Sequence, residues 1–222
     1  MNGCGTGKTA DIQNPYSLTG DNSSVSSQFF ARNLCVTDDI NFGTDQVHAD
    51  YAEGAGVFDL TTKEVLYSQN LFEKLYPAST TKILTAYIII RNCDLDDKVT
   101  VSADAIANMA DSSKCGLAAG DVLTVRDLLY GLLLVSGNDA ANVLAEYYSG
   151  SIDKFAEEMH REAKALGATQ SHFVNANGLP DPNHYTSAHD MALIMQECIK
   201  NETFCRIESD LTYTIQPTNM TS

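Results

Sequence analysis

Apolar and polar positions follow three patterns along the chain, and each predicts a different kind of segment. Residues 1–45 are rich in Ser, Asn, Asp, Gly and Thr, which predicts a disordered N-terminal arm. Two short runs with many apolar and β-branched residues, 54–60 and 64–68, flank a polar connection and predict a β-hairpin. Between about residues 100 and 200 the apolar residues recur mainly at helical spacing, which predicts an all-helical portion.

Capping residues predict where several of these helices begin. A Ser or Thr at a helix start can accept a hydrogen bond from a backbone N–H, and an acidic residue three positions later strengthens the prediction. The starts predicted in this way are Thr124 with Asp127, Ser151, and Ser187 with Asp190. Weaker patterns predict a short helix after Ser102, a short strand over 99–101 and a strand over 211–216. We therefore expect an α+β fold in which helices pack against an antiparallel sheet.

One predicted helix start carries residues suited to nucleophilic catalysis. Residues 77–82 read Pro-Ala-Ser-Thr-Thr-Lys and lead into the apolar run 83–90. Ser79 and Lys82 lie three positions apart, so a helix places both side chains on one face. A serine hydroxyl is a weak nucleophile near neutral pH and needs a base, and burial lowers the pKa of a lysine. The spacing therefore suits a Ser79 nucleophile with Lys82 as its general base.

The same spacing also occurs where no chemistry is expected. Ser151 and Lys154 repeat the Ser-x-x-Lys pattern, but Ser151 follows Gly150 and opens an amphipathic run in which Lys154 lies off the apolar face. We interpret this second pair as a helix cap and a solvated lysine. A helix cap is also the alternative interpretation of Ser79.

A second polar segment, Ser136-Gly137-Asn138, falls between two apolar helical runs. Helices on both sides would hold such a turn rigidly, which suits a preorganised site. Ser136 could relay a proton, and the Asn138 amide could hold a substrate. The alternative interpretation is a plain connection between helices, because Ser, Gly and Asn are common turn residues.

Together these segments resemble the serine D-alanyl-D-alanine carboxypeptidases, the low-molecular-mass penicillin-binding proteins. The resemblance covers about residues 52–200, and its motifs stand in the family's order. The matching segments are 56–60, 63–67, 76–82, 132–140, 172–185 and 190–193.

The resemblance implies a fold, a site and a substrate. The fold is that of β-lactamases and transpeptidases. The catalytic residues are Ser79, Lys82 and Ser136, Asn138 binds the substrate, and neither a cofactor nor a metal takes part. The substrate is the D-Ala-D-Ala end of a peptidoglycan stem peptide, from which the terminal D-Ala is removed through an acyl-enzyme on Ser79. β-Lactam antibiotics are expected to acylate the same serine.

The family's third motif, Lys-Thr-Gly on a strand, has no match after Asn201. The resemblance implies that it lies beyond Ser222, beside the Ser79 helix, where it binds the substrate carboxylate and completes the oxyanion hole. Removing one oxyanion donor alone slows such enzymes by about 10²-fold or more. We therefore expect residues 46–222 to form an incomplete penicillin-binding domain. It would be either a fragment or one piece of a clipped protein whose C-terminal remainder stays bound.

Three alternative functions stay open. A penicillin-binding scaffold or sensor without turnover is favoured by the unmatched third motif and opposed by the intact Ser79 motif. A class A β-lactamase carries Ser-Asp-Asn where this chain has Gly137, and it needs a deacylating glutamate that is not evident after Asn138. A zinc D,D-peptidase would need ligands such as His184 and His189, whose spacing fits no known ligand motif.

Net charge and the N-terminal residues bear on partners and location. The chain has 29 Asp and Glu against 14 Lys and Arg, a formal charge of −15, so nucleic acid and anionic membrane surfaces are not expected partners. No apolar run is long enough to span a bilayer. The Gly3-Cys4 pair before a polar tail resembles a bacterial lipoprotein processing site. It implies lipid on Cys4 and a location outside the cytoplasm.

The chain has six cysteines, which permit disulfides in such a compartment. On one continuous helix Cys198 and Cys205 would lie about 10 Å apart, too far for a bridge. A break in the helix near Asn201 would remove that objection.

Overall fold

The computed structural model describes residues 40–45, 47–107, 109, 112–216 and 218–219. The strands are β1 (Ala55–Asp59), β2 (Glu64–Gln69), β3 (Lys98–Thr100) and β4 (Val122–Thr124). The helices are the 3-10 turn η1 (Ala78–Thr80), α1 (Thr81–Asn92), α2 (Val125–Leu134), α3 (Asn138–Ser149), α4 (Ile152–Ala165), α5 (Ala188–Cys198) and α6 (Glu202–Ser209). Most of the predicted arm, Cys4 included, lies outside the described residues.

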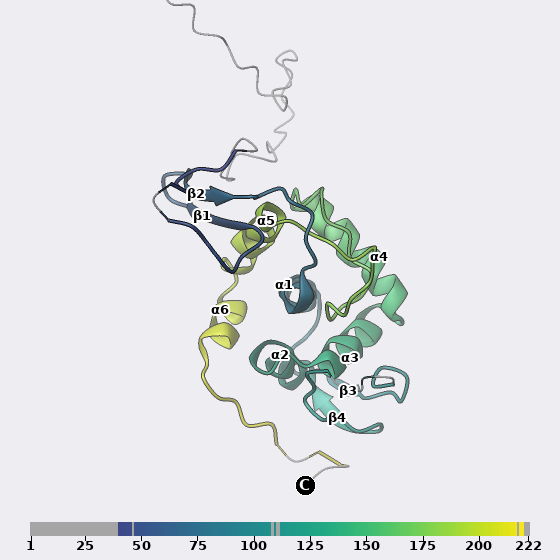
Figure 1. Cartoon of the computed structure of the whole chain (residues 1–222). Helices are drawn as coiled ribbons and strands as arrows, with labels where there is room; N and C mark the ends of the chain where they lie inside the picture. The colour runs from purple at the N-terminus through teal and green to yellow at the C-terminus, as the bar shows by residue number, and fades with distance from the viewer. Residues whose placement is uncertain (1–39, 46, 108, 110–111, 217, 220–222) are drawn as a thin grey trace, which may run out of the picture.

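Helix α1 lies at the centre of the molecule (Figure 1). It contacts α2, α3, α4, α5 and α6, and most of its residues are buried. A helix that is apolar on nearly every side is stable only when other elements surround it, and residues 83–90 are almost wholly apolar. The groups at the N-terminus of α1 are therefore held by a helix that cannot shift without moving the core.

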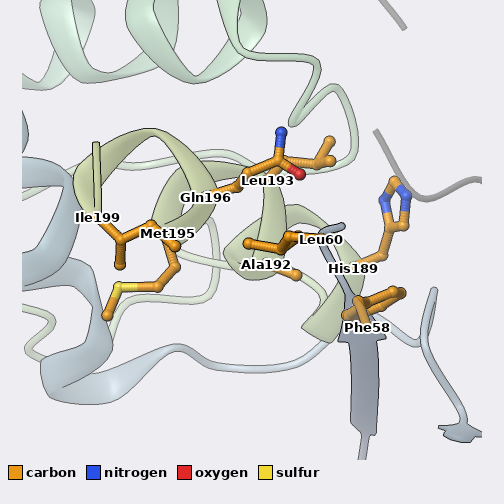
Figure 2. Close-up of a pocket in the computed structure, with 8 residues that line it drawn as sticks. All are labelled: Phe58, Leu60, His189, Ala192, Leu193, Met195, Gln196 and Ile199. Carbon is orange, nitrogen blue, oxygen red and sulfur yellow. The ribbon is translucent and has the colours of Figure 1, made fainter. Parts of the chain in front are cut away.

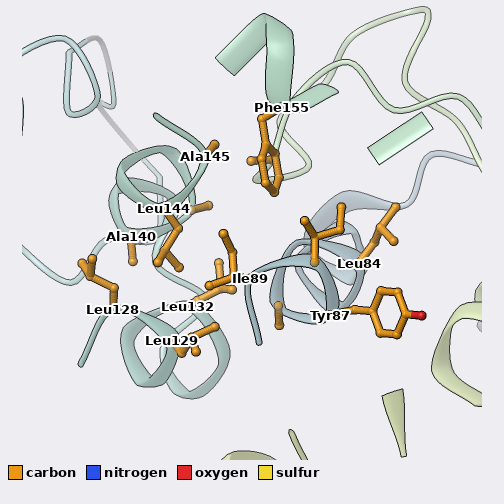
Figure 3. Packing of buried hydrophobic residues seen from close by; sticks show 14 of the residues in the cluster. Leu84, Tyr87, Ile89, Leu128, Leu129, Leu132, Ala140, Leu144, Ala145 and Phe155 are labelled. Atoms are coloured by element: carbon orange, nitrogen blue, oxygen red, sulfur yellow. The ribbon is translucent and has the colours of Figure 1, made fainter. Parts of the chain in front are cut away.

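The core between α1, α2, α3 and α4 is built from large apolar side chains (Figure 3). Ile89, Leu132, Leu144 and Phe155 have no exposed surface. Burying one such side chain stabilises a fold by roughly 1.5–3 kcal/mol. This packing ties the turn between α2 and α3 to the central helix.

The strands form two separate antiparallel pairs rather than one sheet. β1 pairs with β2, with a register shift between Val57 and Phe58, and α5 packs against β1. Phe42 extends this pair through two backbone hydrogen bonds with Ser68, of 2.8 and 3.0 Å. β3 pairs with β4 at the opposite end of the molecule (Figure 1). The α+β class and the hairpin are confirmed, while the predicted helical portion also contains the β3–β4 pair.

The three predicted helix caps are confirmed. Thr124 and Asp127 form a reciprocal capping box at the start of α2. Ser151 caps α4 by accepting a hydrogen bond from the Lys154 backbone N–H, and Ser187 caps α5 in the same way from Asp190. Each signal lies within four residues of sequence, so no distant contact is needed for it to act.

Two other predicted elements are wrong. After Ser102 the described residues form turns rather than a helix, although the Ser102 hydroxyl does accept a hydrogen bond from the Ala105 N–H. Residues 211–216 form no strand, because the described residues offer them no neighbouring strand to pair with. Instead the Tyr213 ring stacks on Tyr130 with the ring centres 3.7 Å apart. β4 and α6 were not predicted.

The chain does break near Asn201, which caps α6 after α5 has ended at Cys198. No bridge follows, since Cys198 and Cys205 are both free thiols, as are Cys93 and Cys115. Among the described residues, no helix has the length and apolar character needed to cross a bilayer.

Candidate active site

Ser79 lies in the 3-10 turn η1, immediately before α1, and is exposed. The residue before it, Ala78, has a φ of +47°, a left-handed conformation that is costly for any residue other than glycine. The backbone thus turns sharply to present Ser79 at the N-terminal end of α1. The positive end of the helix dipole lies at this end.

The turn at Ala78 is held in place by a loop from far along the chain. Gly178 lies so close to it that a Cβ atom at position 178 would come within 1.8 Å of the Ala78 carbonyl oxygen. Gly178 also has a φ of +86°, which favours glycine. Only glycine fits here, and the loop can therefore pack directly on the turn that presents Ser79.

Lys82 occupies the first turn of α1 and is only 2% exposed. Its Nζ atom donates to three oxygens: Ser79 Oγ at 3.2 Å, Asn138 Oδ1 at 2.7 Å and the Asn177 carbonyl at 2.6 Å. Burial lowers the pKa of Lys82 to about 8, whereas the usual value for lysine is 10.5. A neutral Lys82 amine is therefore accessible near neutral pH.

The segment 135–138, which joins α2 to α3, carries the other two expected site residues. Asn138 begins α3, and its side-chain oxygen contacts Lys82. Ser136 has a φ of +56°, and its hydroxyl oxygen is buried without a hydrogen-bond partner among the described residues. The structure thus brings Ser79, Lys82 and Asn138 together, whereas Ser136 contacts none of them through a hydrogen bond.

The carboxylate of Asp139 fastens the segment 115–117 to this turn. It is buried and accepts backbone N–H groups from Cys115, Gly116 and Leu117, at 2.9 to 3.1 Å. The Cys115 sulfur packs closely against two glycines. A Cβ atom added to Gly131 would lie 2.5 Å from this sulfur, and one added to Gly137 would lie 2.3 Å from it. Burial raises the pKa of this thiol to about 12. The sequence analysis missed both Asp139 and Cys115, although Asp139 stands directly beside Asn138.

His184 supports the other side of the Ser79 turn. Its Nδ1 accepts a hydrogen bond from the Val174 N–H at 3.1 Å, so its protonated Nε2 donates to the Thr81 hydroxyl at 2.8 Å. Burial lowers the pKa of His184 to about 4, and the ring is therefore neutral at physiological pH. His184 is a structural residue beside the site, and the described residues contain no group of three or more side chains suited to hold a metal ion.

Comparison with known proteins identifies the family. Residues 42–220 match the family described as D-alanyl-D-alanine carboxypeptidase, peptidase family S11. This chain belongs to that family. The second Ser-x-x-Lys pair lies at the start of α4, where Ser151 accepts a hydrogen bond from the Lys154 backbone N–H.

The chain matches only part of the length of its curated relative. The chain is 39% identical over 163 residues to the D-alanyl-D-alanine carboxypeptidase DacF of Bacillus subtilis, a match that covers 71% of this chain and 41% of that protein. The chain thus spans about 40% of the length of this curated relative.

Two solved structures have a similar fold. The D-alanyl-D-alanine carboxypeptidase of Mycobacterium tuberculosis is 34% identical with a TM-score of 0.67, over 72% of this chain and 60% of that chain. Penicillin-binding protein 5 of Haemophilus influenzae is 36% identical with a TM-score of 0.64, over 68% of this chain and 46% of that chain.

An apolar pocket of about 170 Å³ lies elsewhere on this S11 family member. Phe58 and Leu60 line it from the end of β1, and α5 supplies most of the other wall, including Met195 (Figure 2). Its lining includes none of Ser79, Lys82, Ser136 and Asn138. The pocket is thus separate from the candidate active site.

Proposed function

We propose that this protein is a serine D,D-carboxypeptidase that removes the terminal D-Ala from peptidoglycan stem peptides and is acylated by β-lactams. The observation that carries the proposal is the set of three hydrogen bonds at Lys82 Nζ. A neutral amine has two N–H donors and one lone pair. If the donors stay on Asn138 Oδ1 and the Asn177 carbonyl, the lone pair faces the Ser79 hydroxyl. That is the arrangement that a general base requires.

Acylation follows from these positions. Ser79 Oγ attacks the carbonyl carbon of the bond between the two D-Ala residues while its proton passes to Lys82 Nζ. The Asn138 oxygen is committed to Lys82, which leaves its NH₂ group to donate to the substrate's peptide group. Developing charge on the carbonyl oxygen lies near the N-terminus of α1, where the helix dipole favours it.

Release of D-Ala requires a proton on the leaving nitrogen. Ser136 is proposed to relay this proton from Lys82, and its buried hydroxyl, which has no hydrogen-bond partner among the described residues, is available for that role. The C–N bond then breaks and an ester on Ser79 remains. Water attacks the ester, and its proton returns through Lys82, so that the acyl peptide leaves and Ser79 is restored.

We infer from the family resemblance that a Lys-Thr-Gly segment completes the site by binding the substrate carboxylate. It would be supplied by further chain or by a separate bound piece. The S11 relatives contain much sequence outside the matched part, which supports this inference. A pull-down with the tagged protein from its own cells, followed by mass spectrometry of the bound peptides and of the protein's C-terminus, tests it.

We also propose that the protein acts outside the cytoplasm and is anchored by lipid on Cys4. The support is the peptidoglycan substrate of the family and the Gly3-Cys4 pair. Labelling cells with a fatty-acid analogue should mark the protein, and Cys4→Ala should abolish the label. A label that persists in Cys4→Ala would contradict the anchor.

The experiment that tests the enzymatic proposal is intact mass measurement of the purified protein before and after excess penicillin. We expect one adduct, mapped to the peptide that contains Ser79 and absent from Ser79→Ala. Release of D-Ala from a pentapeptide ending in D-Ala-D-Ala tests turnover. An adduct without turnover would identify a penicillin-binding scaffold, and a folded protein without an adduct would contradict the proposal.

A further inference from the structure

Two buried asparagines link helix α3 to the loop that contacts Lys82. Asn142 on α3 is 7% exposed and Asn177 is 4% exposed. Asn177 Nδ2 donates to Asn142 Oδ1 at 3.0 Å, and Asn142 Nδ2 donates to the Ala105 carbonyl at 3.1 Å. A polar group buried without a partner is costly, so this pairing is strongly preferred over any arrangement that breaks it.

The side chain of Asn177 is fastened at both ends. Besides its bond to Asn142, its Oδ1 accepts the Leu179 N–H at 2.8 Å. The Asn175 side chain adds a bond to the Gly178 N–H at 2.7 Å. The backbone at position 177 is therefore fixed, although it lies in a loop, an element that is usually more mobile than a helix.

The fixed backbone atom that matters is the Asn177 carbonyl, which accepts from Lys82 Nζ at 2.6 Å. We propose that Asn142 and Asn177 are positioning residues, which hold this carbonyl so that one Lys82 N–H is occupied and the remaining lone pair faces Ser79. The inference rests on the proposed role of Lys82 as base. A general base misplaced by about 1 Å can lose on the order of 10²-fold in rate, so such positioning has a measurable effect.

The atom that contacts Lys82 is the backbone carbonyl of Asn177, so side-chain substitutions can remove the groups that position this carbonyl without removing the carbonyl itself. Asn177→Ala keeps the carbonyl that contacts Lys82 and removes only the side chain that fixes it. Asn142→Ala removes the other half of the same hydrogen bond. Asn201→Ala is the matched control, because it removes an asparagine that caps α6 through two backbone N–H groups and has no contact with Lys82.

The first readout is the titration of Lys82 itself, followed by the ¹³Cε shift of the labelled lysine. A hydrogen bond to the charged form of a group favours that form. Loss of the fixed carbonyl should therefore lower the Lys82 titration midpoint by about one pH unit in each variant. Cys115 is the titratable side chain that faces Lys82, with Asp139 behind it, and this thiol stays protonated through the range of the titration.

The second readout is the rate constant of penicillin acylation at pH 9, with its pH dependence. We expect about a tenfold fall in each single variant and less than about a twofold further fall in the double variant, because both changes break one linkage. Asn201→Ala should lower the melting temperature while leaving both readouts unchanged.

Two results would overturn the inference. One is a Lys82 midpoint that is the same in Asn142→Ala, Asn177→Ala and the unsubstituted protein. The other is a fall in the double variant that equals the product of the two single falls. If the unsubstituted protein is not acylated at Ser79, the proposed function fails, while the titration still decides whether the two asparagines position Lys82.

Discussion

At the scale of single residues, Lys82 is held by oxygens from three separate parts of the chain. Ser79 lies three residues before it, Asn138 lies 56 residues after it and Asn177 lies 95 residues after it. The sequence predicted the first contact because both residues fall within one helical turn. It predicted Asn138 as a site residue from the polar turn between two apolar helical runs and from the family resemblance, but not its contact with Lys82. The Asn177 carbonyl left no signal, because every residue type has a backbone carbonyl and only the folded loop brings this one to Lys82.

The lowered pKa of Lys82 leads to a prediction for pH dependence. Deprotonation creates the base, so the rate of Ser79 acylation by penicillin should rise with pH and reach half its maximum near pH 8. Below that midpoint the rate should fall about tenfold per pH unit. Stopped-flow acylation between pH 6 and pH 10 measures this profile.

Two variants test whether acylation depends on Lys82 as a base or only on the Ser-x-x-Lys spacing. Lys82→Arg should abolish acylation, because arginine stays protonated. Lys154→Arg should have no effect, because Lys154 has the same spacing from Ser151 but is exposed on α4. Acylation that survives in Lys82→Arg, or a midpoint below pH 7, would rule out Lys82 as the base.

His184 predicts a second pH effect, on stability. Its pKa is about 4 in the folded protein and 6.5 as the ordinary value, so the unfolded chain binds a proton first as the pH falls. The neutral His184 ring therefore contributes stability that is fully present above pH 6.5. This contribution is lost progressively as the pH falls from 6.5 through 4. It amounts to roughly 3 kcal/mol. Urea unfolding at several pH values should show a smaller loss in His184→Gln than in the unsubstituted protein, and an equal loss in both would contradict the assignment.

At the scale of elements, capping pairs followed by a long apolar run predicted helices correctly, whereas the cap at Ser102 and the alternation over 211–216 did not lead to the predicted elements. The caps at Thr124, Ser151 and Ser187 act within one turn, and all three helices form. β4 has only three residues and is held by its pairing with β3. A run this short carries no local pattern that predicts a strand. The alternation over 211–216 was a strand signal without a partner strand among the described residues. Pattern alone does not supply the neighbour that a strand requires.

Asp139 gives a prediction for the segment 115–117. Asp139→Ala leaves three backbone N–H groups of this segment without their acceptor, and hydrogen bonds to charged groups each contribute about 1.5–3 kcal/mol. We expect a loss of roughly 3 kcal/mol in the free energy of unfolding and faster amide exchange at Gly116 and Leu117. Asp153→Ala is the control, because Asp153 occupies the same second position of α4 but is exposed. Unchanged exchange at these two amides would contradict the proposed anchor.

At the scale of the whole molecule, α1 is the element that every other helix of the described residues contacts. Ile89 lies in it without exposed surface, whereas Val57 on β1 is 52% exposed. Ile89→Ala should lower the free energy of unfolding by about 2–5 kcal/mol, because it removes buried apolar atoms and leaves a cavity. Val57→Ala should change stability by less than about 0.5 kcal/mol. Denaturant unfolding followed by circular dichroism measures both, and similar losses in the two variants would argue against α1 as the centre of the core.

The close approach of Cys115 to Gly131 constrains the order in which this sequence can change. A methyl group at position 131 collides with the Cys115 sulfur at 2.5 Å but stands an ordinary 3.7 Å from the Cys115 Cβ. Alanine at 131 therefore forces the sulfur to move while a thiol is present, whereas no such shift is needed once position 115 has become alanine. Descendants of this sequence should therefore acquire the smaller residue at 115 before they acquire alanine at 131.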